Sequence, residues 1–116
     1  MKHISYRGFN ASALTFESDA QFTKGDPVAI SSEGACSAAE NGDLFIGVCV
    51  AVRGNLITSQ MEGFVETAYS GTAPTCGWGK LCADGEGGVK VSSASNAPLY
   101  RIIEVDTENK TVGFIL

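Results

Sequence analysis

The segment Asp43–Gly71, DLFIGVCVAVRGNLITSQMEGFVETAYSG, contains three consecutive stretches of β-strand character with almost nothing between them. In the first, Asp43–Arg53, the even positions from Leu44 to Val52 are apolar, and the odd positions from Phe45 to Ala51 are apolar or small. Because side chains alternate across a strand, a strand without a polar face should be covered on both sides. Arg53-Gly54-Asn55 then supplies a tight turn, and Leu56–Met61 and Phe64–Tyr69 follow. The segment predicts a small closed β-structure with a packed interior, whose function lies on loops, edges or an assembly surface.

Short strands and turns continue on both sides of this segment. Fourteen glycines recur mainly at turns, and no segment of helical period is long enough to predict a helix, although one short helix could lie within Ser32–Asn41 or Ser92–Leu99. Eight to ten short strands indicate an all-β fold, a small single-domain β-barrel or β-sandwich. The further strands are expected at Leu14–Phe16, Val28–Ser31, near Ala35–Ala38, and at Lys80–Ala83, Val89–Val91, Leu99–Asp106 and Thr111–Leu116.

Length and charge bound the class of protein. The 116 residues suit one domain with a self-sufficient core, and the net charge is −5. The eight lysines and arginines are scattered singly, whereas nucleic-acid binding needs a basic stripe, so we expect no nucleic-acid partner. The N-terminus has no long apolar run, so we expect neither a signal peptide nor a membrane span. We therefore expect the chain to fold in a reducing cytoplasm.

The first residues differ in composition from the rest. Met1–Asn10 is positively charged and partly aromatic, and no acidic residue precedes Glu17. We expect residues 1–12 to form an N-terminal arm, flexible in the free protein, and residues 13–116 to form the β-barrel body. An ordinary first strand of the barrel is an equally good interpretation. The residues that distinguish the arm are Lys2, His3, Tyr6, Arg7 and Phe9.

The four cysteines predict no metal site. Cys36, Cys49, Cys76 and Cys82 form neither a C-x-x-C pair nor a zinc-ribbon spacing. Buried free thiols are the favoured interpretation, ahead of a disulfide or a metal site. Cys76 and Cys82 flank Trp78 and are the pair most expected to approach each other. We expect no cofactor.

The sequence favours a non-enzymatic protein. The one histidine, His3, lies near the chain start, where it cannot be held rigidly in a catalytic triad, and the acids form no obvious pair. Gly63–Gly71 loosely resembles a motif of trimeric dUTP pyrophosphatases, in which Glu66 would orient the attacking water and Tyr69 would stack on the deoxyribose. The family has Asp where Glu66 stands and a second Asp where Ala68 stands, and its other nucleotide-binding motifs are missing. One degenerate motif is a weak signal for catalysis.

Most of the chain resembles the small capsid decoration, or head-stabilising, proteins of tailed bacteriophages and their prophages. Two strands with the patterns G-D-x-V and I-G-V, followed by a G-x-V strand, are its most recognisable parts. The matching stretches are Phe22–Val28, Gly42–Val48, Arg53-Gly54, Gly63–Glu66, Gly77–Leu81, Asp84–Val91 and the Val105–Leu116 hairpin.

This resemblance implies a non-enzymatic β-barrel or β-tulip protein without catalytic residues. Such proteins bind the major capsid protein on the outer surface of the expanded head, often as trimers, and oppose the pressure of packaged DNA. We therefore expect a homo-oligomer, with a trimer favoured, made in the host cytoplasm and carried on the virion.

The expected contact residues lie on the arm and among the aromatic side chains of the body. Core packing is an alternative for each aromatic residue, and for Trp78 and Tyr100 it is at least as good an interpretation. Two other functions remain open: a hydrolytic or small-molecule-binding β-barrel, and a phage tail or spike-base component. The candidates for capsid or self contact are Lys2, Tyr6, Arg7, Phe9, Tyr69 and Trp78.

Overall fold

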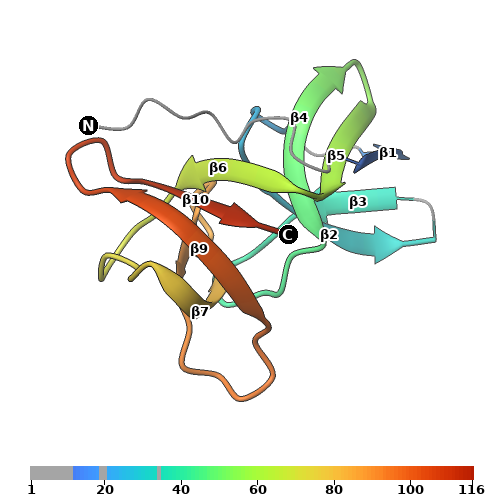
Figure 1. Cartoon of the computed structure of the whole chain (residues 1–116). Coiled ribbons are helices and arrows are strands. Elements are labelled where there is room, and N and C mark those ends of the chain that lie inside the picture. Colours follow the sequence, from blue (N-terminus) through green and yellow to red (C-terminus); the bar gives the residue numbers. More distant parts are fainter. Residues whose placement is uncertain (1–11, 19–20, 34) are drawn as a thin grey trace.

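The computed structural model of the protein describes residues 12–18, 21–33 and 35–116. Every regular element in these ranges is a β-strand, and the strands form two sheets (Figure 1). The all-β prediction is confirmed. The strands are β1 (Ser12–Glu17), β2 (Pro27–Ser32), β3 (Ala35–Ala38), β4 (Gly47–Arg53), β5 (Leu56–Glu62), β6 (Phe64–Ala68), β7 (Gly77–Ala83), β8 (Val89–Val91), β9 (Leu99–Asp106) and β10 (Thr111–Ile115).

The first sheet is a closed barrel with the strand order β1-β3-β2-β4-β5. The antiparallel pair β1–β5 runs from Ser12 opposite Glu62 to Glu17 opposite Leu56. Closure is made by a single parallel pair, Glu17 with Ala35 of β3. The barrel is therefore held mainly by the β4–β5 and β1–β5 ladders, and its seam at β1–β3 is short.

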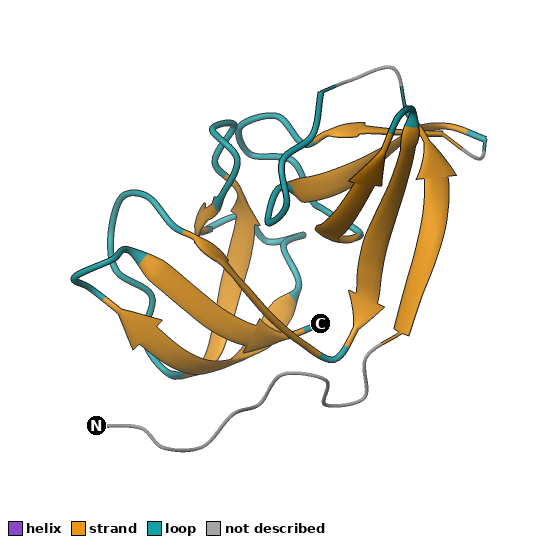
Figure 2. Ribbon diagram, turned by 90° about the horizontal axis from the view of Figure 1, so that it is seen from above, coloured by secondary structure: helices purple, strands orange, loops and turns teal. Residues whose placement is uncertain are grey.

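The second sheet has the order β6-β10-β9-β7-β8 and lies beside the barrel, as Figure 2 shows. Its two edges also approach each other, because Tyr69 forms an isolated bridge with Val89 and the Ser70 N–H donates to the Val89 carbonyl at 3.0 Å. The predicted C-terminal hairpin is confirmed as β9 and β10. The Gly85–Gly88 turn likewise joins β7 to β8 as the sequence predicted.

The three strands of the central segment are confirmed as β4, β5 and β6, with one correction. The first strand begins at Gly47 and not at Asp43, because the Asp43 carboxylate accepts a hydrogen bond from the Glu40 N–H and holds a turn. The prediction that this strand is covered on both faces is correct for Gly47–Cys49, which are buried. It is wrong for Ala51–Arg53, which are exposed. β2 pairs with β4 only as far as Val48, so the outer half of β4 pairs only with β5 among the described residues, and β5 pairs there with β1 on its other side.

Neither of the two places where a short helix was considered contains one in the described residues. The first, Ser32–Asn41, includes β3. This strand pairs with β2 in a ladder that runs from Val28 opposite Ala38 to Ser32 opposite Ala35. The second is a turn that ends in a 3.3 Å hydrogen bond from the Ala97 N–H to the Ala94 carbonyl.

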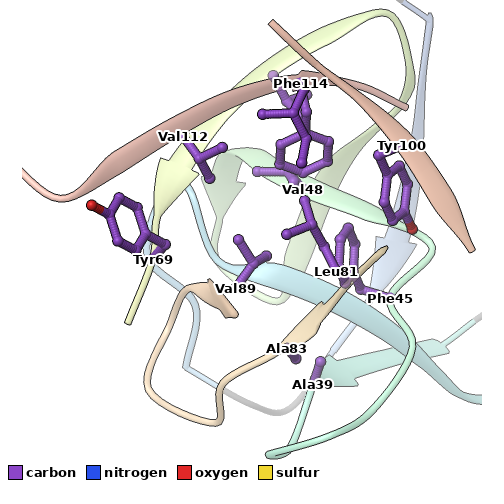
Figure 3. Close-up of a cluster of buried hydrophobic side chains, with 12 residues drawn as sticks. Ala39, Phe45, Val48, Tyr69, Leu81, Ala83, Val89, Tyr100, Val112 and Phe114 are labelled. Atoms are coloured by element: carbon purple, nitrogen blue, oxygen red, sulfur yellow. The ribbon is translucent and has the colours of Figure 1, made fainter. Parts of the chain in front are cut away.

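Two hydrophobic clusters fill the body. The larger cluster lies between the sheets and includes Phe45, Tyr100 and Phe114, whose ring centroids are 5.2–6.1 Å apart (Figure 3). The smaller cluster lies in the barrel and comprises Val28, Cys36, Cys49 and Ile57, with Phe16, Phe22 and Ile46 packed against it.

Polar links join the two sheets as well. The Thr67 hydroxyl of β6 donates to the Gly25 carbonyl at 2.6 Å. On the other side, the Ala83 N–H of β7 donates to the Asp43 carbonyl at 2.9 Å. The sheets thus share both a core and a hydrogen-bond network, and they pack as one body.

Burial of the Tyr100 phenol predicts that folding stability falls at high pH. Burial raises the pKa of Tyr100 to about 12, from an ordinary value near 10. Between these values the unfolded chain releases the phenolic proton while the folded protein keeps it, so folding stability is complete below about pH 10 and falls as the pH rises toward 12. Urea unfolding of wild type and of the Tyr100→Phe variant between pH 9 and 12 should show a steeper decline for wild type. Parallel declines would contradict a buried phenol as the cause.

Candidate interaction surface

The outer face of the second sheet carries the most exposed aromatic residue of the described chain. On β7, Leu81 and Ala83 point into the core, so Trp78 and Lys80 point outward. Trp78 lies between Gly77 and Gly79 on this strand, and its side chain is 70% exposed.

The neighbouring strand β9 extends this exposed area. Trp78 pairs directly with Arg101, and Lys80 pairs with Leu99, which is 56% exposed. The Lys80 ammonium group donates to the Ala94 carbonyl at 3.3 Å, which holds the lysine stem along the sheet. We call the residues Trp78, Lys80, Leu99 and Arg101 the Trp78 patch.

The opposite end of the same face is acidic. Glu66 of β6 and Glu104 of β9 both lie opposite Gly113 of β10 and therefore flank it on the outer face. Together with Asp106 and Glu108 they line an open hollow of about 480 Å³. We call the residues Glu66, Glu104, Asp106 and Glu108 the acidic rim.

Local structure fixes the acidic rim in place. A Cβ on Gly113 would meet the Phe64 ring and the Glu104 side chain, so a larger residue there would displace one or both of them. Asp106 accepts hydrogen bonds from the Glu108 and Asn109 N–H groups at 3.0 and 3.1 Å, which shapes the β9–β10 turn. The rim is thus part of the rigid sheet and its hairpin.

Tyr69 was expected to be a contact residue at the surface, but the structure buries it. It is 4% exposed, belongs to the larger core cluster, and sits where β6 bridges to Val89. The Lys110 ammonium group lies 5.9 Å from its ring centroid. Tyr100 is also a core residue, in agreement with the alternative interpretation, whereas Trp78 is not.

The structure does not bring the residues of the nucleotidase-like motif together. Val65, Thr67 and Tyr69 are buried on one side of the strand, and Glu66 lies on the other side. A second open hollow, of about 490 Å³, lies between the sheets, and Glu66 is the one acidic residue among its described lining residues. Within the described ranges no three His, Cys, Asp or Glu residues gather as a metal site would require.

All four cysteines are free thiols, and Cys76 and Cys82 are not paired. Cys36, Cys49 and Cys82 are buried as predicted, and burial raises the thiol pKa of Cys36 and of Cys49. Cys76 is exposed, contrary to the prediction, and its thiol donates to the Ile103 carbonyl at 3.5 Å. It lies in the loop before β7, outside both clusters.

The arm candidates Lys2, Tyr6, Arg7 and Phe9 lie outside the described residues, so only Trp78 of the predicted contact residues is seen at the surface. Sequence reasoning missed Lys80, Leu99 and Arg101 as its neighbours. Their alternation along β7 and β9 was visible, but the register that pairs Trp78 with Arg101 was not.

No protein-family model matches this chain, and a search of curated proteins found no similar sequence. Among the described residues there is no helix of the length and apolarity that crossing a membrane requires.

Proposed function

We propose that this protein is a non-enzymatic structural protein of a tailed-phage virion that binds the outer surface of the head and stabilises the capsid. The major capsid protein is its partner. The observation that carries this proposal is a body filled by two core clusters, with Trp78 exposed on a rigid sheet face. Aromatic anchors of this kind dominate the energetics of protein interfaces.

The motifs that resemble decoration proteins support the proposal because they build this body. Gly25, Gly85 and Gly87 have φ values of 102°, 80° and 86°, which glycine adopts without strain. Gly47 and Val48 are buried where β4 enters the core. The resemblance therefore rests on residues that determine the shape of the protein.

The position of β1 suits docking of the arm on a shell. Only Glu17 of β1 pairs with β3, so the remaining residues of that edge, from Ser12 to Phe16, have no strand partner on that side among the described residues. The basic segment Met1–Asn10 precedes this strand. Addition of such a segment to a sheet edge of a capsid subunit would supply main-chain hydrogen bonds on docking, with its positive charge suited to an acidic surface.

The test is co-sedimentation with expanded, DNA-free heads that lack this protein, prepared from the phage or prophage that encodes it. The full chain should sediment with the heads at a fixed ratio to the major capsid protein. A variant without Met1–Asn10 should lose binding while its melting temperature stays within about 2 °C of wild type, since terminal residues seldom hold a core. A matched substitution away from the arm, Lys24→Glu, should bind normally.

Three results would contradict the proposal. The full chain could fail to bind heads, or it could bind isolated tails and not heads. It could also release pyrophosphate from deoxynucleotides in the presence of Mg²⁺. Unchanged binding of the shortened variant would exclude the arm while leaving head binding to the body.

A further inference from the structure

We propose that the exposed indole of Trp78 is the stacking platform of a binding site for an acidic sugar unit, such as a uronic acid in a polysaccharide. The site consists of the Trp78 patch and a hollow beside it at the edge of β7. This binding goes beyond attachment to heads, because its ligand is a glycan and the site needs no capsid protein.

Trp78 offers an exposed aromatic surface on an ordered strand. Its side chain is 70% exposed, and β7 is held there by the pairing of Trp78 with Arg101 and of Lys80 with Leu99. An indole ring is large, flat and apolar, with one polar N–H at its rim. The C–H groups on one face of a sugar ring form a flat apolar surface, while its hydroxyl groups point outward around the ring. A sugar ring can therefore cover the indole and keep its hydroxyls free for polar partners.

The edge of β7 offers such partners next to the indole. The Lys80 carbonyl accepts a hydrogen bond from the Ser92 N–H at 3.0 Å, on the side of β8. Since the main-chain groups of alternate residues in an antiparallel strand point to the same side, the N–H and carbonyl of Trp78 also point that way. β8 pairs with β7 only from Leu81 to Ala83, so no described strand pairs with Trp78 on this side. Sugar hydroxyls match these two groups, because a hydroxyl both donates and accepts.

A hollow of about 270 Å³ adjoins this edge. Trp78 and Lys80 line it from β7, and residues 72–75, which include two threonines, line it from the preceding loop. Sites for drug-sized ligands measure about 300–1,000 Å³, so this hollow suits a single sugar unit. A peptide that adds to a sheet edge needs a longer row of free main-chain groups than the edge offers between this loop and Ser92. The dimensions of the site therefore favour a sugar over a peptide strand.

Two cations make an acidic sugar the expected ligand. Arg101 is exposed directly opposite Trp78, and Lys80 lines the hollow, although the whole chain has a net charge of −5. The Lys80 ammonium group donates to the Ala94 carbonyl at 3.3 Å, which leaves two of its three N–H groups for a ligand. A guanidinium group can hold a carboxylate through two parallel hydrogen bonds. A uronic acid would thus meet a stacking ring, a guanidinium group and an ammonium group together.

Fluorescence of the full chain tests the site directly, because Trp78 is the only tryptophan. Titration with tetragalacturonate at low salt should change the emission saturably, with a Kd below about 1 mM. Neutral maltotetraose, which lacks the carboxylates, should bind at least about tenfold more weakly. Tetraglutamate has the same number of side-chain carboxylates on a peptide and should give no saturable change.

Variants assign the binding to the named residues. Arg101→Gln should weaken tetragalacturonate binding about tenfold, the usual effect of losing a hydrogen bond to a charged group. Arg53→Gln is the matched control, since it removes the same charge from an exposed arginine of the β4–β5 hairpin and should bind like wild type. Trp78→Ala should lose binding by at least about tenfold, measured by saturation-transfer NMR on the sugar protons. Circular dichroism confirms that each variant is folded.

The proposal is overturned if tetragalacturonate gives no saturable change up to about 1 mM. It is also overturned if folded Arg101→Gln or Trp78→Ala binds like wild type, if maltotetraose binds equally well, or if tetraglutamate binds equally well, which would indicate a peptide site. Attachment to heads is measured separately by co-sedimentation without sugar. Loss of sugar binding with retained head binding would overturn this site alone, and the reverse result would overturn only the proposed function.

Discussion

Replacing Phe114 with alanine is expected to lower the free energy of unfolding by about 3–5 kcal/mol, the usual cost of removing a buried phenylalanine. Phe114 is fully buried on β10 and packs edge-on against both Tyr100 and Phe45, at centroid distances of 5.2 and 6.1 Å. Because these rings come from the second sheet and from the segment that leads into β4, the cavity would open between the two sheets. A domain of ordinary stability, about 5–15 kcal/mol, would lose a large part of it.

Urea unfolding of wild type and variant, followed by circular dichroism, measures this loss. Phe114→Leu keeps most of the volume and should cost less than Phe114→Ala. Trp78→Ala is the matched aromatic control, since an exposed side chain should change stability by no more than about 0.5 kcal/mol. A loss below about 1 kcal/mol for Phe114→Ala would mean that the two sheets do not share this core.

Replacing Gly47 with valine should prevent normal folding. A Cβ at this position would overlap with the Ser59 hydroxyl and the Gln60 carbonyl oxygen of the adjacent strand β5. The hydroxyl can rotate away, but the carbonyl belongs to the backbone, so β4 and β5 would have to separate. Overpacking in a core commonly costs about 1–3 kcal/mol, and a clash with the backbone should reach or exceed the upper value.

Soluble yield and urea unfolding of Gly47→Val test this expectation. Ala51→Val is the control, because it adds volume on the exposed outer half of the same strand and should leave stability within about 0.5 kcal/mol of wild type. A Gly47→Val variant as stable as the control would show that β4 and β5 can separate there at little cost.

The sequence predicted local structure correctly where the alternation of side chains and the turn residues formed a clear pattern. Alternation and turn residues located the β4–β5 and β9–β10 hairpins, because the partners of a hairpin are close in the chain. The division into two sheets depends on long-range pairs such as β1 with β5 and β6 with β10. No local pattern specifies those pairs, so the strands and hairpins were predictable but the arrangement of the strands in two sheets was not.

The candidate surface was predictable only in part, for a related reason. The residues of β7 alternate between Trp78, Lys80 and Cys82 on one side and Gly79, Leu81 and Ala83 on the other. A large apolar side chain such as Trp78 would be expected in the core, but the side of β7 that faces the core carries Leu81 and Ala83. Tyr69 shows the opposite case, because its burial depends on a bridge to Val89, twenty residues away in the sequence.

We propose that this body works by holding a phage head together. The most direct measurement is DNA release on heating, with and without a chelator of divalent cations, from otherwise identical DNA-filled heads that carry or lack the protein. We predict that heads lacking it release DNA at a lower temperature and that adding the purified chain restores the higher one. Identical release temperatures for bare heads and for heads saturated with the protein would contradict the claim.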